Sequence, residues 1–87
     1  MGRIRLLLVD DHALVRAGLQ MLLQAQPDME IVAEASSGPE AIELAQMHQP
    51  DVVLMDVTMP GMNGMEATRR LKACCPEIAV LALTIHE

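Results

Sequence analysis

The strongest constraint on the fold is an alternation of short apolar runs with segments of helical spacing. The apolar runs predict strands at residues 4–9, 29–35, 51–56 and 77–84. The segments between them predict helices that end near Pro27, Pro50 and Cys75. Strands that alternate with helices favour one parallel sheet with helices on both of its faces. The sequence therefore predicts an α/β fold.

The second predicted helix has the clearest start signal. Gly38 is a plausible cap, Pro39 suits the first helical position, and Glu40 lies favourably near the positive end of the helix. The residues expected on the inner faces of the second and third helices are Ala41, Ile42, Ala45, Met65, Thr68 and Leu71. Because the chain has no Phe, Trp or Tyr, its methionines are expected to fill the core, in particular Met21, Met47, Met55 and Met65.

Composition excludes several classes of protein. The chain has 87 residues, enough for one domain, and 52% of them are hydrophobic. Its net charge of −6 and its lack of a Lys or Arg cluster argue against direct nucleic-acid binding. No signal peptide or membrane span is expected. Two adjacent cysteines, Cys74 and Cys75, are interpreted as reduced thiols of a cytoplasmic protein.

Polar side chains end three of the predicted strands. Asp10 and Asp11 follow the first strand, Asp56 ends the third, and Thr84 ends the fourth. In open parallel sheets, ligands bind beyond the carboxyl ends of the strands, where the strand order reverses. If the first and third strands are neighbours, these four side chains meet at one edge of the sheet.

Three crowded carboxylates repel one another and raise one another's pKa values, and a divalent cation relieves this repulsion. Oxygen ligands without a nearby His or Cys favour Mg²⁺. One of the carboxylates can then attack a phosphoryl donor and form an acyl phosphate. Two points stay open here. Instead of binding a metal, Asp11 can simply cap the helix that starts near His12. His12 itself is either a helix-start residue or a proton donor or phosphoryl relay.

Three segments resemble a known family: "LLLVDDHALVRAGL", "DVVLMDVTMPGMNGMEATRRL" and "AVLALTIHE". They are similar to the receiver domain of bacterial two-component response regulators, and the match spans essentially the whole chain. The pattern DDH-x-x-x-R-x-G-L resembles the NarL/FixJ (LuxR-type) subfamily. The resemblance implies a three-layer, flavodoxin-like parallel sheet. Its strand order, with strands numbered along the chain, is 2-1-3-4-5 in the family and 2-1-3-4 in the part present here.

The resemblance also implies a role for each residue of the acidic edge. Asp56 is the expected phosphoacceptor and a metal ligand, and Thr84 is the expected switch hydroxyl. Asp11 is expected to bind Mg²⁺ directly, Asp10 through a metal-bound water, and Thr58 through its backbone carbonyl. The expected phosphoryl donor is a sensor histidine kinase, and the domain is expected to catalyse only its own phosphorylation. In full-length relatives, phosphorylation controls DNA binding and transcription.

The chain departs from the family pattern near its end. The family has a lysine and an aromatic switch residue on its fifth strand, whereas this chain has no lysine after Lys72 and no aromatic residue. Residues 1–87 are therefore expected to be the N-terminal part of a receiver domain, without the last helix–strand–helix and the DNA-binding output domain. "IAVLALT" is then expected to be an exposed edge strand that promotes self-association or dimerisation.

Two other functions compete with this interpretation. One is an Mg²⁺-dependent phosphatase with Asp56 as nucleophile. Such enzymes usually place a second acid two residues later, where this chain has Thr58. Multiple turnover on a phosphate ester would favour that reading. The other is a non-signalling fragment that associates through its exposed sheet edge, which a pull-down with an intact receiver would reveal.

Overall fold

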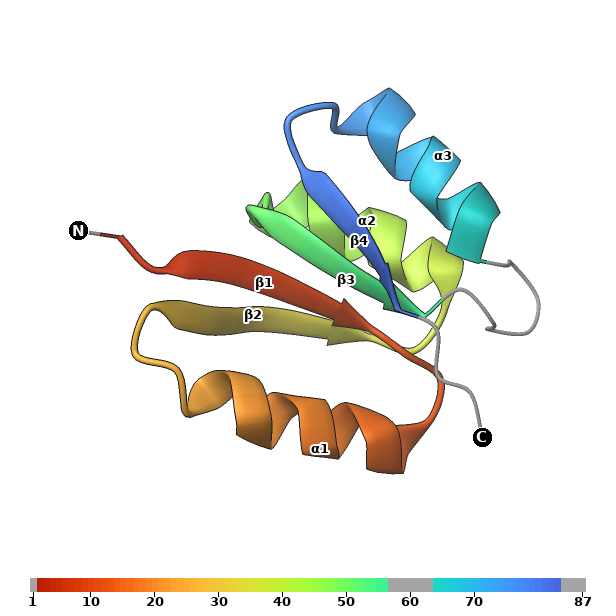
Figure 1. The fold of residues 1–87 in the computed structure, drawn as a ribbon. Coiled ribbons are helices and arrows are strands. Elements are labelled where there is room, and N and C mark those ends of the chain that lie inside the picture. Colours follow the sequence, from red (N-terminus) through yellow and green to blue (C-terminus); the bar gives the residue numbers. More distant parts are fainter. Residues whose placement is uncertain (1, 57–63, 84–87) are drawn as a thin grey trace.

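Helices and strands alternate along the whole described part of the chain (Figure 1). The computed structural model describes residues 2–56 and 64–83. Its elements are, in order, β1 (Ile4–Val9), α1 (Ala13–Gln24), β2 (Met29–Ala35), α2 (Gly38–His48), β3 (Val52–Asp56), α3 (Gly64–Cys74) and β4 (Ala79–Leu83). The strands form one parallel sheet in the order β2-β1-β3-β4. The predicted α/β fold and the strand order 2-1-3-4 are confirmed.

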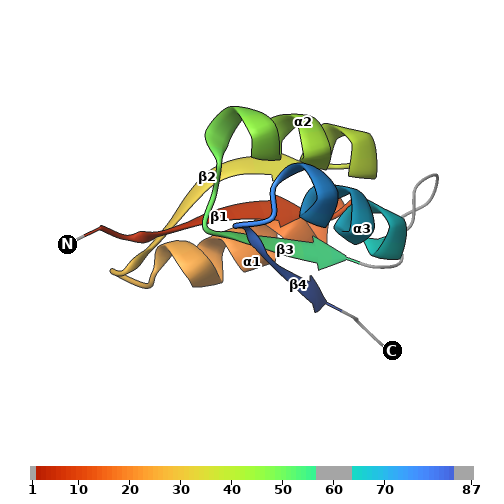
Figure 2. The ribbon, with the colours of Figure 1, turned by 90° about the horizontal axis from the view of Figure 1, so that it is seen from above.

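The core lies between the sheet and helices α2 and α3, which cover the same face (Figure 2). Alternate strand residues point to this face, because side chains alternate along a strand. The helices contribute mainly small residues that let them approach the sheet closely. The buried side chains of this core include Leu7, Val9, Val53, Met55, Ala41, Ala45, Ala67 and Leu71.

Two expectations about the core need correction. Met65 was expected to point inward but is 71% exposed, because Ala67 and Leu71 occupy the inner face of α3. Among the methionines expected in the core, Met55 is fully buried, whereas Met21 and Met47 are exposed like Met65. Alanine and leucine side chains already fill the space under α2 and α3, so Met47 and Met65 stay at the surface, whereas α1, which carries Met21, has no buried residue at all.

The opposite face of the sheet is only partly covered in the described part of the chain. Leu8, Leu54 and Leu81 are register partners in β1, β3 and β4 and therefore form a row on that face. Helix α1 lies over this side and packs against β2 (Figure 2). Exposure rises along the row, from 1% at Leu8 to 54% at Leu81. The apolar surface beside β4 is therefore open to solvent.

Helix α2 starts one residue earlier than predicted, because the residue that was expected to cap the helix is part of it. Ser37 is the N-cap, and its hydroxyl accepts a hydrogen bond of 3.3 Å from the backbone N–H of Glu40. The Glu40 carboxylate in turn accepts one of 2.7 Å from the N–H of Ser36. Gly38, the predicted cap, is the first residue of the helix. Serine takes the capping role because its side chain supplies an acceptor and glycine has none.

Among the described residues, no helix is both long and apolar enough to cross a membrane.

Candidate metal and phosphoacceptor site

Two buried aspartates end neighbouring strands. Asp10 directly follows β1, and Asp56 is the last residue of β3, which pairs with β1. Only 2% of Asp10 and 3% of Asp56 is exposed. The backbone N–H of Asp10 donates a hydrogen bond of 3.0 Å to the carbonyl of Ala35 in β2. The sheet itself therefore fixes where these carboxylates lie.

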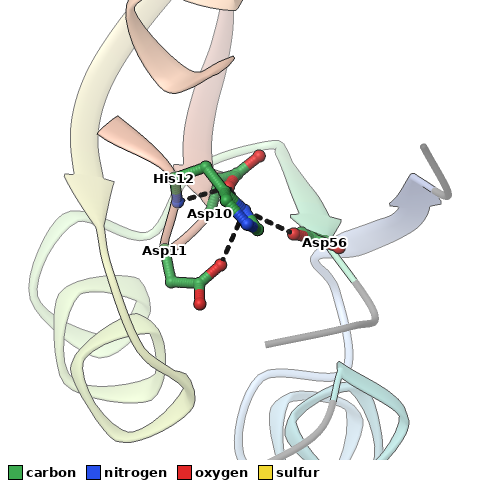
Figure 3. A group of neighbouring side chains, drawn as sticks. All are labelled: Asp10, Asp11, His12 and Asp56. Atoms are coloured by element: carbon green, nitrogen blue, oxygen red, sulfur yellow. Dashed lines mark hydrogen bonds and ion pairs between the residues drawn. The ribbon is translucent and has the colours of Figure 1, made fainter. Parts of the chain in front are cut away.

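A compact cluster forms where these strands end (Figure 3). One potential ligand atom from each of its four members lies within 4.8 Å of the other three, and the members are Asp10, Asp11, His12 and Asp56. The three predicted acids thus lie together, as the rule for parallel sheets required. Thr58 and Thr84, the other two predicted site residues, lie outside the described residues.

His12 was not expected inside the cluster, which was predicted to offer oxygen ligands alone. Its Nδ1 lies 2.9 Å from Asp11 Oδ1, 3.2 Å from Asp10 Oδ1 and 3.7 Å from Asp56 Oδ2 (Figure 3). The hydrogen bond to Asp10, followed by the charge of Asp11, raises the pKa of His12 above 6.5. The protonated imidazole therefore offsets part of the negative charge of this cluster.

The start of helix α1 explains how His12 reaches the acids. His12 is the N-cap of α1, with an extended backbone and no hydrogen bond from its side chain to the helix. Its backbone N–H donates a hydrogen bond of 2.7 Å to Asp10 Oδ1. His12 is thus a helix-start residue, as one of the two hypotheses for this residue predicted. The alternative that Asp11 caps this helix is wrong, because His12 holds that position.

The carboxylate oxygens of this cluster are suited to bind a hard cation. Asp10 Oδ2 and Asp11 Oδ1 are buried and make no hydrogen bond in the structure, and the contact of Asp11 Oδ1 with His12 is electrostatic only. Buried carboxylate oxygens without hydrogen bonds are costly. A cation bound between them removes this cost, and carboxylate oxygens are the ligands that Mg²⁺ prefers. Because 61% of the His12 side chain is exposed, it has space to turn into solvent.

Arg16 supports the cluster from one turn further along α1, and no role was predicted for it. Its Nη1 donates a hydrogen bond of 2.6 Å to the backbone carbonyl of Asp10, and its Nε donates one of 3.1 Å to Glu34 Oε1. The arginine thus ties the end of β1 to β2. The sequence pattern that could have predicted this role is the DDH-x-x-x-R motif. Residues four apart on a helix are neighbours on one face, so the motif places Arg16 next to His12.

Residues 6–87 match the family of response regulator receiver domains. The chain belongs to this family. Receiver domains act in the phosphorelay signalling of two-component systems, where they interact with sensor histidine kinases and bind Mg²⁺ at an acidic pocket. This receiver has a cluster of Asp10, Asp11, His12 and Asp56 where β1 and β3 end.

The relatives of this receiver are transcription regulators. It is 49% identical over 86 residues to the transcriptional regulatory protein LiaR of Bacillus subtilis, covering 97% of this chain and 41% of LiaR. A LuxR-family response regulator from Aurantimonas sp. superposes with a TM-score of 0.92 at 40% identity, over 99% of this chain and 61% of that one. The receiver domain of NarL from Mycobacterium tuberculosis gives 0.92 at 33% identity, over 100% of this chain and 70% of that one. The NarL/FixJ (LuxR-type) resemblance and the flavodoxin-like fold are confirmed. The chain spans about two fifths of the length of the curated relatives it matches.

Proposed function

We propose that Asp56 accepts a phosphoryl group from the phosphohistidine of a sensor histidine kinase. The observation that carries this proposal is the position of Asp56 at the end of β3, with Asp10 and Asp11 beside it. A carboxylate oxygen of Asp56 forms a bond to phosphorus while the bond between phosphorus and the histidine nitrogen breaks. The imidazole leaves with the bonding electrons and takes up a proton. The receiver catalyses only this reaction on itself.

Asp11 and Asp56 are the proposed direct protein ligands of Mg²⁺, together with the backbone carbonyl of Thr58. Asp10 acts through a metal-bound water. When bound, Mg²⁺ offsets the negative charge on the phosphoryl oxygens. Thr84 is the proposed switch hydroxyl, which hydrogen-bonds the phosphorylated Asp56. The buried oxygens of Asp10 and Asp11 that make no hydrogen bond support this assignment, while the roles of Thr58 and Thr84 rest on the family resemblance alone.

The proposed output is control of transcription. In this proposal residues 1–87 correspond to the N-terminal part of a receiver domain, and they make no direct contact with nucleic acid. The net charge of −6 supports that second point. Phosphorylation biases a two-state surface of the receiver, which controls DNA binding in the full-length cytoplasmic protein.

A second copy of the chain is the other proposed partner. Strand β4 is the last in the order of the described sheet, and Leu81 on it is 54% exposed. An exposed apolar edge strand is a template for pairing with another chain. The 87-residue chain by itself is therefore expected to self-associate through β4.

The test of phosphoacceptor function is an intact mass measurement after incubation with acetyl phosphate and Mg²⁺. The expected result is one added phosphoryl group on the wild-type chain and none on Asp56→Asn. Glu43→Gln is the matched control, because Glu43 is an exposed acid on α2, and it should be phosphorylated like the wild type.

Three outcomes would contradict the proposal. The first is an unmodified wild-type chain in a sample shown to be folded by circular dichroism. The second is an equal phosphoryl adduct on Asp56→Asn, which would place the acceptor elsewhere. The third is repeated turnover of a simple phosphate ester, which would favour the phosphatase alternative.

A further inference from the structure

Two thiols converge at the end of α3. Cys74 is the last residue of this helix, and the Sγ atoms of Cys74 and Cys75 lie 2.8 Å apart. The backbone N–H of Cys75 donates a hydrogen bond of 2.7 Å to the carbonyl of Leu71, so the helical turn continues through this residue. Consecutive residues of a helix do not normally face each other. This contact, in which either thiol can be the donor, places the two sulfurs near enough to bind one atom together.

The thiol pair borders a cavity of about 550 Å³. The cavity lies between the end of α2, the residues that lead into β3, and the connection from α3 to β4. Both cysteines line it, and its polar lining comes from Gln46, Gln49, Asp51 and Glu77. Asp51 directly precedes β3, whereas Asp56 ends it, so the cavity is at the opposite end of the sheet from the acidic cluster.

A disulfide between Cys74 and Cys75 is geometrically unfavourable. Adjacent Cα atoms are only about 3.8 Å apart across a trans peptide bond. An unstrained disulfide usually needs roughly 4.4–6.8 Å between its Cα atoms. A bridge with one extra atom between the two sulfurs is longer and relieves this constraint. The geometry thus favours a thiophilic atom held between Cys74 and Cys75.

We propose that Cys74 and Cys75 form a two-thiol binding site for trivalent arsenic compounds. An arsenical of the form R–As=O makes two As–S bonds, one to each Sγ, and breaks its bond to oxygen. The two thiol protons leave with that oxygen as water. Arsenic stays trivalent and sulfur keeps its oxidation state, so the step needs no oxidant or reductant.

The protonation of the pair favours an arsenical over a simple metal cation. Burial, and then the neighbouring Cys74, raise the pKa of the Cys75 thiol to about 11, so it keeps its proton at neutral pH. A metal cation must expel that proton into solvent, because thiolates are the metal-binding form. The arsenical instead consumes the proton in forming water.

The number of available ligands also favours an arsenical over a metal cation. A structural zinc site needs four ligands. Within the described parts of the chain, no third His, Cys, Asp or Glu joins these cysteines in a group that is compact enough to hold a metal ion. Trivalent arsenic needs three ligands, of which two are the sulfurs and the third is its own substituent. The adjoining cavity has room for that substituent.

The experiment uses the 87-residue chain and phenylarsine oxide as the probe. Intact mass under native conditions should show one phenylarsenic group on the wild type, with both thiol hydrogens lost. Excess glutathione should leave it in place, and ethanedithiol should remove it. Cys74→Ser and Cys75→Ser each keep one thiol and should lose the group to glutathione, because two linked contacts bind roughly 100-fold or more tighter than one. Asp56→Asn should bind like the wild type, which separates this site from the acidic cluster.

Thermal unfolding distinguishes a site of the folded protein from two adjacent thiols in any chain. A ligand that binds the folded state better raises the unfolding temperature. We expect phenylarsine oxide to raise the Tm of the wild type and to leave that of the single serine variants unchanged. A lowered Tm would overturn the proposal, because the unfolded chain would then be the better ligand. Retention of the group by either serine variant in glutathione would overturn it as well.

Discussion

Arg16 holds the backbone of Asp10 through a hydrogen bond of 2.6 Å from its Nη1 to the Asp10 carbonyl. The same guanidinium contacts Glu34 in β2, and only 23% of the arginine side chain is exposed. One side chain of α1 thus connects the ends of two strands beside the acidic cluster. The position of the Asp10 carboxylate depends on this connection, because the carbonyl and the carboxylate belong to the same residue.

Replacing Arg16 with alanine should destabilise the fold. The variant loses a charge-assisted hydrogen bond to a partly buried carbonyl, which is worth about 1–3 kcal/mol in free energy of unfolding. Urea denaturation of Arg16→Ala measures the loss. Arg69→Ala is the matched control, because Arg69 is exposed on α3, and it should change stability by less than about 0.5 kcal/mol. Equal stability of the two variants would show that the Arg16 contacts contribute nothing.

Mg²⁺ should stabilise the wild-type chain through the acidic cluster. A ligand of the folded state at ten times its Kd adds about 1.4 kcal/mol to the free energy of unfolding. The Tm should rise with MgCl₂ and return to its starting value with EDTA. Asp11→Asn should abolish most of the rise, while Glu43→Gln should keep it. A rise of the same size in Asp11→Asn would mean that Mg²⁺ acts elsewhere.

The raised pKa of His12 predicts a pH dependence of stability in Mg²⁺-free buffer. Asp10 and Asp11 favour the protonated imidazole in the folded state, so the folded pKa is above the unfolded value near 6.5. The contribution of His12 is therefore fully present below about pH 6.5 and is lost as the pH rises through the folded pKa. NMR titration of the imidazole should show the raised pKa, and Asp11→Asn should lower it. If the urea midpoints of the wild type and His12→Gln shift in parallel above pH 6.5, the acids have no such effect.

Self-association should depend on the open edge of the sheet. Light scattering of the wild-type chain should give a mass that increases with protein concentration. Leu81→Lys should reduce this increase, because a lysine on an edge strand opposes pairing with another chain. Leu14→Lys is the control, since Leu14 is 86% exposed on α1, away from β4. A mass of one chain at every concentration would refute the prediction.

The fold and the meeting of the acids were predictable because both follow from local sequence patterns. Apolar runs defined the strands; Asp10 and Asp11 are the two residues after one such run, and Asp56 ends another. Once β1 and β3 are neighbours in a parallel sheet, Asp10 and Asp56 must share one edge. No side-chain detail was needed for that conclusion. The roles of Thr58 and Thr84 stay predictions, because the structure does not describe those residues.

The features that the sequence did not reveal depend on three-dimensional side-chain placement. His12 joins the acids because its backbone N–H bonds to Asp10 and turns the chain back toward the cluster. Met47 and Met65 are exposed because alanines occupy the inner faces of their helices. A methionine at helical spacing has the same pattern whether it points inward or outward, so residue type alone could not decide between the two.

The pairing of β1 with β3 also determines when the acidic cluster can exist during protein synthesis. Asp10 and Asp11 leave the ribosome with the first strand, whereas Asp56 follows only after α1, β2, α2 and the rest of β3 have been made. Pairing between strands so distant in sequence is intrinsically slow, because the entropy of loop closure is lost before the contacts form. A nascent chain that ends before β3 therefore carries two of the acids without the proposed acceptor. If Asp56 is the acceptor, as proposed, the chain can be phosphorylated there only after the third strand has been added beside the first.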